Sequence, residues 1–280
     1  MNIYNKIAEY SNKGMPFVIC TVVDKKGDGP VEIGKKMVVT PDNHAFGTVG
    51  GGALEYNARE LCKELLITRQ SMTKTYLLNE GKILNDAETL PMTCGGVITL
   101  FFEYIGPKAF VYIFGAGHVG QALTNILKTV NFHVTVIDER TDVIEKFVGG
   151  DVLVNIPFSE YLDTHTLEKN SFIVVCTPSH KYDYSVINKV IEKKLKLQYF
   201  GMLCSKEKLK DYIKKTYETY GEDVDLTNFY SPIGLDLGGG SPEEIAISIT
   251  SEILAVSNKK ENHVHMRNTI NSKEYHYFKK

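Results

Sequence analysis

Residues 114–123, FGAGHVGQAL, decide how more than half of this chain folds. An apolar run, FVYIFG, leads into this stretch, and apolar residues three and four apart continue through QALTNILKTV. Gly115, Gly117 and Gly120 therefore stand between a predicted strand and a predicted helix, in the spacing G-x-G-x-x-G. A turn of this kind lets a helix pack closely on a strand of a parallel sheet.

The segments around this turn show the same alternation of strand and helix. The strand candidates from Phe110 onward are FVYIFG, FHVTVID, SFIVVCT and LQYFGML, and helical patterns separate them. A final helix has Ser241 as N-cap, Pro242 at the first position and Glu244 at the third. The predicted fold class is α/β, with a C-terminal Rossmann-like doubly wound parallel sheet.

A smaller α+β domain precedes that sheet. FVICTVV, KKMVVT, KTYLLN and VITLFFEYI have strand character, and GGALEYNARELCKELLITRQ has helical spacing. The segment GPKA at 106–109 is a natural boundary. We expect domains at 1–106 and 107–260, followed by a polar tail at 261–280 that is typical of a frayed terminus.

Asp138 ends the second Rossmann strand, 18 residues after the last glycine of the turn. A carboxylate there accepts hydrogen bonds from a ribose and repels a 2′-phosphate, which favours NAD over NADP. The alternative is a Rossmann turn whose glycines serve packing alone. Thr177, His180 and Asp183 follow the strand SFIVVCT at the ligand-binding edge of such a sheet. His180 and Asp183 are candidate catalytic residues, and a plain surface histidine is the alternative.

Two further glycine turns lie in the first domain. Gly50, Gly51 and Gly52 open a helix, so they form either a backbone nest for an anion or a strained turn. Cys94 stands beside Gly95 and Gly96, where a thiolate is a soft ligand for a metal or a carrier of sulfur. We expect Cys94 to be the most reactive of five cysteines that show no CxxC spacing.

Composition excludes several classes of protein. A formal charge of −2 gives no basic excess for nucleic acid, and no apolar run approaches the roughly 20 residues of a membrane span. The first residues, MNIYNKIAEYSNKG, lack the apolar centre of a signal peptide. We expect a cytoplasmic protein with neither nucleic-acid nor membrane partners.

Taken together, these motifs resemble the XdhC/CoxI family of accessory factors for molybdenum hydroxylases. The resemblance rests on GTVGGGALE at 47–55, CGG at 94–96, FGAGHVGQAL, VIDER at 136–140, the TxxHxxD spacing from Thr177, GMLCSKEKL at 201–209, and SPIGLDLGGGSPEEIAISITSEILA at 231–255. It implies a protein that binds molybdenum cofactor in its pterin form, supports its sulfuration and delivers it to a hydroxylase such as xanthine dehydrogenase. A cysteine desulfurase and a second copy of the chain are further implied partners.

The resemblance adds Glu55, His118 and Arg140 to the candidate cofactor-binding residues, and Cys94 to the candidate molybdenum or sulfur contacts. The chain departs from the family in two places. GDGPVEIG at 27–34 puts Asp28 and Glu32 where a serine-rich, arginine-bearing loop is usual, which argues against anion affinity there. Cys204 replaces a glycine.

Two other functions remain open at this point. One is an NAD-dependent oxidoreductase with His180 as acid or base, and the other is a nucleotide-sensing regulator. Neither requires Cys94 or the outer glycine turns, so we expect a carrier with little turnover of its own.

Overall fold

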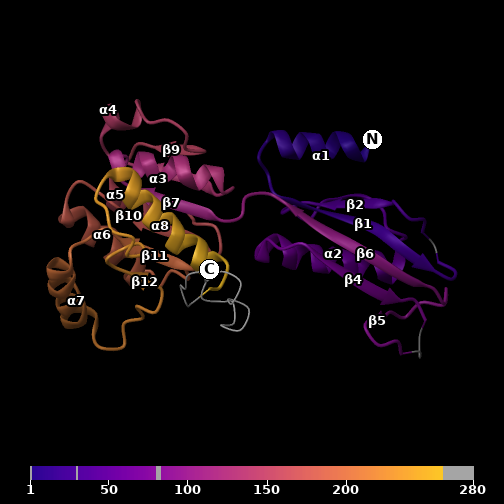
Figure 1. Cartoon of the computed structure of the whole chain (residues 1–280). Coiled ribbons are helices and arrows are strands. Elements are labelled where there is room, and N and C mark those ends of the chain that lie inside the picture. Colours follow the sequence, from indigo (N-terminus) through magenta and orange to yellow (C-terminus); the bar gives the residue numbers. More distant parts are fainter. Residues whose placement is uncertain (1, 30, 80–82, 261–280) are drawn as a thin grey trace, which may run out of the picture. The chain divides into compact units, whose positions relative to one another are not determined.

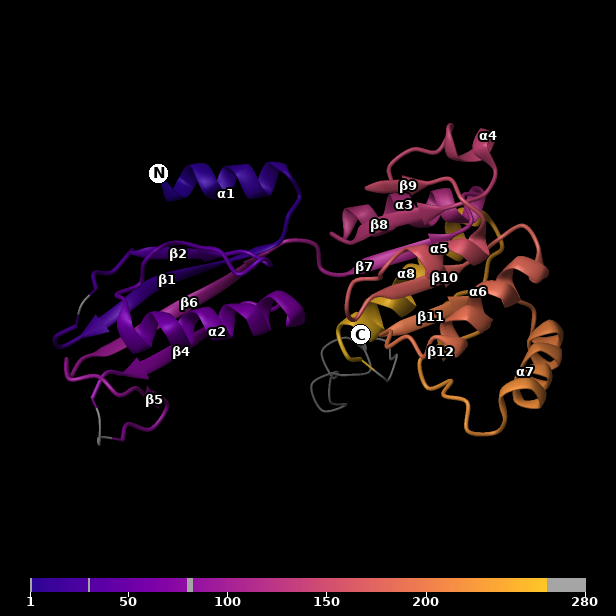
Figure 2. The same cartoon turned by 180° about the vertical axis from the view of Figure 1, so that it is seen from behind.

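The structure is a computed structural model that describes residues 2–29, 31–79 and 83–260. Its contacts divide the chain into two compact units, Met1–Lys108 and Ala109–Lys280, and the division falls within the GPKA segment. The polar tail expected at 261–280 lies outside the described residues. Figures 1 and 2 show each unit as a sheet with helices on both faces.

The first unit is built on a mixed six-stranded sheet with the order β3-β2-β1-β6-β4-β5. All neighbours pair antiparallel except β4 and β5. The strands are β1 (Phe17–Lys26), β2 (Lys36–Val39), β3 (Ala45–Gly47), β4 (Met72–Leu77), β5 (Glu88–Thr89) and β6 (Val97–Ile105).

Alternation along β1 gives this sheet two buried faces. Val18, Cys20 and Val22 belong to the apolar cluster covered by helix α2 (Gly52–Thr68). Phe17 and Ile19 point to the other face and pack against helix α1 (Ile3–Asn12). The predicted smaller α+β domain is therefore confirmed, with one helix on each face of its sheet (Figure 1).

The second unit contains a six-stranded sheet in the order β12-β11-β10-β7-β8-β9, and every pair is parallel. Its strands are β7 (Phe110–Phe114), β8 (His133–Ile137), β9 (Val152–Val154), β10 (Phe172–Val175), β11 (Tyr199–Met202) and β12 (Phe229–Tyr230). The chain runs outward from β7 in one direction and then from β10 in the other. This order is that of a Rossmann sheet, with its switch point between β7 and β10.

Helices cover both faces of the parallel sheet (Figure 2). The helices are α3 (His118–Thr129), α4 (Thr141–Ile144), α5 (Phe158–Thr164), α6 (His180–Glu192), α7 (Lys206–Tyr220) and α8 (Pro242–Ser257). Val111 and Ile113 of β7 face the cluster that holds α3 and α8, while Tyr112 and Phe114 face α5 and α6. The doubly wound fold predicted from the sequence is confirmed.

The start of α8 is also as predicted. The Ser241 hydroxyl accepts from the Glu244 backbone N–H, and the Glu244 carboxylate accepts from the Ser241 N–H in return. This reciprocal pair satisfies backbone donors that would otherwise lack partners at the helix N-terminus. None of the helices in the described ranges combines the length and apolar character needed to cross a bilayer.

Candidate functional site

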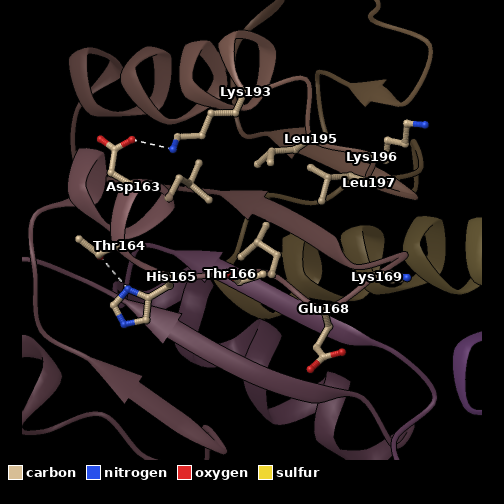
Figure 3. Close-up of a pocket in the computed structure, with 12 residues that line it drawn as sticks. Asp163, Thr164, His165, Thr166, Glu168, Lys169, Lys193, Leu195, Lys196 and Leu197 are labelled. Atoms are coloured by element: carbon tan, nitrogen blue, oxygen red, sulfur yellow. Dashed lines mark hydrogen bonds and ion pairs between the residues drawn. The ribbon is translucent and has the colours of Figure 1, made fainter. Parts of the chain in front are cut away.

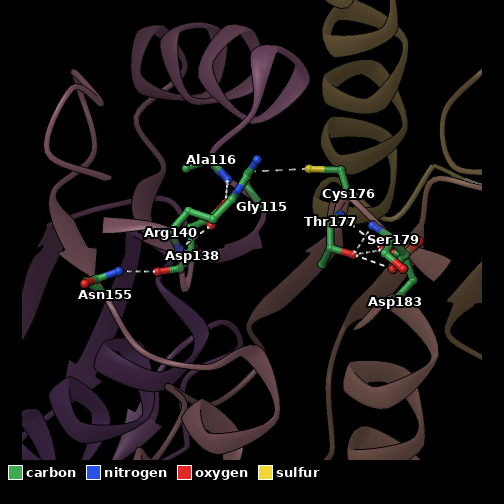
Figure 4. Close-up of polar contacts among 9 residues, drawn as sticks. All are labelled: Gly115, Ala116, Asp138, Arg140, Asn155, Cys176, Thr177, Ser179 and Asp183. Carbon is green, nitrogen blue, oxygen red and sulfur yellow. Dashed lines mark hydrogen bonds and ion pairs between the residues drawn. The ribbon is translucent and has the colours of Figure 1, made fainter. Parts of the chain in front are cut away.

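The glycine turn after β7 lies at the switch point, against the chain that leaves β10 (Figure 4). A Cβ on Gly120 would lie 2.0 Å from the Gly115 carbonyl oxygen, and a Cβ on Gly115 would lie 2.3 Å from the Cys176 carbonyl oxygen. Gly115 also has φ +125°, which favours glycine. Packing and backbone conformation therefore account for these two glycines without any ligand.

Gly117 differs from its two neighbours in the motif. Its φ of −74° is open to any residue, and an added Cβ would meet no heavy atom within 4 Å. Neither strain nor packing requires a glycine here. Gly117 is the N-cap of α3, where glycine is common, and in a turn of this kind it also leaves room for a ligand to approach the backbone, so its open surroundings are compatible with nucleotide binding.

Asp138 follows β8, as predicted, but its carboxylate is fully buried. It accepts from the Ala116 N–H at 2.8 Å and from the Arg140 N–H at 3.0 Å. The Arg140 guanidinium adds two bonds, at 2.9 Å from Nε and 2.7 Å from Nη2 (Figure 4). Burial would raise the pKa of Asp138, but these hydrogen bonds outweigh it and hold the pKa below its usual range.

The described conformation therefore does not offer the Asp138 carboxylate to a ribose. Its two oxygens accept from four N–H groups and hold the glycine turn in place, while the half-exposed Arg140 covers it. A ribose contact stays a prediction, and it requires the guanidinium to move. His118 is exposed at the first position of α3 and stays a prediction as well.

Thr177, His180 and Asp183 gather where β10 ends, as the sequence predicts. Asp183 is buried, and its Oδ1 accepts from the Thr177 N–H at 3.0 Å and from the Thr177 hydroxyl at 2.6 Å. Burial raises the pKa of Asp183 above its usual range despite these bonds. His180 Nδ1 lies 3.3 Å from Asp183 Oδ2 but lacks the alignment of a hydrogen bond.

The other ring nitrogen of His180 has a hydrogen-bond partner. Nε2 lies 2.5 Å from the Nζ atom of Lys208 on α7. An ammonium donates and cannot accept, so this contact requires the lone pair of a neutral imidazole at Nε2. His180 is thus held between a buried carboxylate and an ammonium, and sequence reasoning did not find Lys208.

In the first unit, the backbone conformation of the triple-glycine turn favours glycine at all three positions. Gly50, Gly51 and Gly52 have φ of +121°, +71° and +58°. The Glu55 carboxylate accepts from the Gly51 N–H at 3.2 Å and from the Val49 N–H at 3.3 Å. Of the two interpretations of this turn, the described conformation favours the strained turn, because the chain's own carboxylate takes the position that an anion would occupy, and an anion site here stays a prediction.

The Cys94 turn lies at the same end of the first sheet. Gly95 has φ +77°, and a Cβ on Gly96 would lie 1.9 Å from the Asp28 carbonyl oxygen. A Cβ on Gly52 would lie 3.7 Å from the methyl group of Met92, two residues before Cys94. The fold thus brings together the triple-glycine turn, the Cys94 turn and the loop at 27–34, which are far apart in the sequence.

A cavity of about 520 Å³ lies at this end of the sheet. Lys25, Glu32, Lys35, Thr48 and Gly50 are among the residues that line it. Lysines at the ends of two neighbouring strands therefore lie beside the GDGPVEIG loop, and the expectation of weak anion affinity there stays a prediction. Sequence reasoning missed both lysines, since the sheet brings them together from opposite sides of a turn.

Burial affects most of the cysteines. It raises the pKa of Cys20, Cys62, Cys176 and Cys204. Cys94 is half-buried in its glycine turn, and it is more accessible than Cys20 and Cys62, the buried cysteines of the same unit. Among the described residues, no three His, Cys, Asp or Glu side chains gather closely enough to hold a metal ion. A molybdenum contact at Cys94 stays a prediction, and it needs ligands supplied by the cofactor itself.

Another cavity, of about 360 Å³, is lined by residues 162–169, Lys193 and residues 195–197 (Figure 3). These segments lead into β10 and β11, so the cavity lies at the amino edge of the parallel sheet. Asp163 pairs there with Lys193 at 2.9 Å. Ligands of doubly wound sheets bind at the opposite edge, so we do not assign a site to this cavity.

The contrast between Gly117 and Gly120 gives a direct test. We expect Gly117→Ala to change the free energy of unfolding by less than about 1 kcal/mol, since its Cβ meets open space. Gly120→Ala should cost about 3 kcal/mol through overpacking against the Gly115 carbonyl. Urea unfolding measures both. Calorimetry with NAD and ADP-ribose should show at least tenfold weaker binding by Gly117→Ala, and unchanged binding would contradict a ligand-facing glycine.

Asp183 predicts a pH dependence with a definite sign. Its native pKa is raised, so its contribution to stability is full below the unfolded pKa and is lost as pH rises through the native pKa. Asp183→Asn, which cannot ionise, should therefore gain stability relative to the wild type as pH rises from about 4. Thermal unfolding across pH 4–8 measures the difference.

Asp163→Asn is the matched control, because Lys189 and Lys193 lower the pKa of Asp163. Its relative stability should fall as pH rises from about 2 to 5, which is the opposite sign, so unfolding of this variant is followed down to about pH 2. A fall for Asp183→Asn as well would show that the native pKa of Asp183 is not raised.

Comparison with known proteins agrees with these features. The model of the XdhC Rossmann domain matches residues 111–253, and that of the XdhC and CoxI family matches residues 11–76. The chain is 27% identical over 261 residues to the uncharacterized protein YqeB of Escherichia coli, covering 92% of this chain and 47% of that one. It is 29% identical over 157 residues to a probable xanthine dehydrogenase subunit of Bacillus subtilis, covering 55% and 45%.

The chain thus spans less than half the length of these curated relatives. A crystal structure of a Bacillus halodurans protein, described as a xanthine dehydrogenase, is similar with a TM-score of 0.50 and 19% identity, covering 95% of this chain and 98% of that one. This likeness supports the fold. Since the Rossmann-domain model alone matches more than half of the residues, the chain belongs to the XdhC and CoxI family.

Proposed function

We propose that this chain is an accessory factor of a xanthine dehydrogenase-type hydroxylase, which binds molybdenum cofactor, supports its sulfuration and delivers it. Family membership supports this proposal, as does the similarity to the probable xanthine dehydrogenase subunit of Bacillus subtilis. In this proposal, molybdenum cofactor is the cargo that the chain delivers. A cysteine desulfurase that supplies the sulfur and a homodimeric state are parts of the same proposal.

One observation carries the proposal furthest. The Cys94 turn, the triple-glycine turn and a cavity with two lysines meet at one end of the first sheet. Molybdenum cofactor is a pterin with a dithiolene-bound metal at one end and a phosphate at the other. A soft thiol and a pair of ammonium groups in one region fit those two kinds of group.

The thiol of Cys94 is the group that suits sulfur chemistry. Only a thiolate that reaches solvent exchanges readily with another sulfur compound. Cys20 and Cys62 in the same unit are buried, so their thiols are shielded. Cys94 is therefore the side chain in this unit that we expect to contact the molybdenum or its sulfur.

A nucleotide role of the second unit is the second candidate function, and the open surroundings of Gly117 are compatible with it. An NAD-dependent oxidoreductase would use His180 as acid or base, but Lys208 already bonds the outer ring nitrogen. Proton transfer by His180 would require that contact to break. The Rossmann unit therefore fits nucleotide binding better than it fits hydride transfer assisted by this histidine.

A delivery experiment separates the carrier from the oxidoreductase. Cofactor-loaded protein, mixed with apo-hydroxylase, should restore hydroxylase activity in proportion to the carrier supplied, because each loaded molecule delivers once. Cys94→Ser should lower the active fraction at least tenfold, by removing the soft ligand. Cys204→Ser, a matched change in the other unit, should leave delivery unchanged.

A different set of results would contradict the carrier role. Steady NADH production from a hydroxylated substrate by the purified chain, unaffected by Cys94→Ser and lost in His180→Ala, would replace the carrier with an oxidoreductase.

A further inference from the structure

The cavity beside the triple-glycine turn is lined by both hydrogen-bond donors and acceptors. It lies where β1 ends, β2 begins and β3 ends, so three neighbouring strands of one sheet supply its walls. Lys25 and Lys35 bring ammonium groups to it, whereas Glu32 and Thr48 bring oxygen atoms. A volume of about 520 Å³ is within the range of small-molecule sites in proteins.

Neither lysine of the cavity forms an ion pair with a described residue. Within the described ranges of this unit, Lys6, Lys13, Lys63 and Lys74 form ion pairs with glutamates, but Lys25 and Lys35 form none. Lys25 Nζ donates to the Gly29 carbonyl oxygen at 2.9 Å, which fixes its position without neutralising it. The two ammonium groups therefore favour an anion in the cavity.

Thr48 presents an acceptor to the cavity rather than a donor. Its hydroxyl donates to Glu55 Oε2 at 2.5 Å and accepts from the Gly50 N–H at 3.1 Å. The proton of the hydroxyl is thus committed, and one lone pair remains. Glu55 acts as a positioning residue, because its carboxylate orients Thr48 and holds the glycine turn.

These donors and acceptors are complementary to a ligand that carries both a phosphate and N–H groups. We propose that this cavity binds the pterin-phosphate part of the cargo, with Lys25 and Lys35 on the phosphate and with Glu32 and Thr48 accepting from the heterocycle. Carboxylates accept well from the paired N–H groups of an aminopyrimidinone ring, and lysines bind phosphate as point charges. This inference rests on the proposed function for the identity of the cargo.

The proposal can be tested with the full chain and metal-free probes. The probes are neopterin 3′-monophosphate, neopterin without phosphate, and inorganic phosphate, and quenching of pterin fluorescence measures the two pterin affinities. We expect the phosphate ester to bind at least tenfold more tightly than neopterin, since charge-assisted bonds to the phosphate add to those of the ring. Inorganic phosphate, measured by competition, should be the weakest ligand.

Two substitutions should act on opposite ends of the probe. Lys35→Ala should bring the affinity of the ester down to within about twofold of neopterin and leave neopterin itself unchanged. Glu32→Gln should weaken neopterin about tenfold, while inorganic phosphate binds as well as before or better, because a like charge is removed. Lys36→Ala is the matched control, since Lys36 Nζ donates to Thr21 and does not line the cavity.

The outcomes that contradict the inference differ from those that contradict the proposed function. Equal affinity for the ester and inorganic phosphate, or an unchanged ester affinity in Lys35→Ala, contradicts the proposed site. If the chain loads a hydroxylase while Lys35→Ala binds the ester like the wild type, the proposed function stands and this inference fails. If the probes behave as expected but no hydroxylase is loaded, the carrier role fails and the organic-phosphate site remains.

Discussion

Backbone crowding at the switch point is the constraint on which the Rossmann unit depends. The Gly115 carbonyl lies where a Cβ of residue 120 would be, and the Cys176 carbonyl lies where a Cβ of residue 115 would be. Helix α3 can approach the turn only because residue 120 lacks a side chain, and the chain leaving β10 can approach it only because residue 115 does. That approach places Gly117 at the end of α3 that faces the ligand edge of the sheet, next to the chain leaving β10.

The turns that precede several helices share one kind of hydrogen bond. The carboxylates of Glu55, Asp183 and Glu244 each accept from backbone N–H groups that precede or begin their own helix. Asp138 does the same for the turn before α3 from a neighbouring strand end. These bonds organise the turns without a ligand, and they also repel anions. The phosphate site that we propose in the first unit therefore rests on lysine side chains more than on the glycine backbone.

The sequence predicts the fold well because its signals are local. Strong apolar runs mark β7, β8, β10 and β11, and the cap at Ser241 follows from three neighbouring residues. It does not find β9 or β12, which are three and two residues long and show no alternation. Strands this short are defined by their partners in the sheet rather than by their own pattern.

The site is predicted less completely, since its properties depend on tertiary contacts. The sequence correctly brings Thr177, His180 and Asp183 together, because they lie within one strand end and the helical turn that follows it. It cannot show that Arg140 covers Asp138, or that Glu55 fills the glycine turn. Nothing in the sequence near Lys25 or Lys35 indicates that both line one cavity, because the pairing of β1 with β2 brings them to it.

The most direct measurement is the cofactor content of the full chain, purified from a host that makes molybdenum cofactor. Pterin released from the protein can be identified by fluorescence after oxidation, and molybdenum can be counted by mass spectrometry. A cofactor carrier should hold pterin and molybdenum in equal amounts, approaching roughly one of each per chain, with both lowered together in Cys94→Ser. A chain that holds neither, purified from cells whose own hydroxylase is fully loaded, would contradict the carrier role.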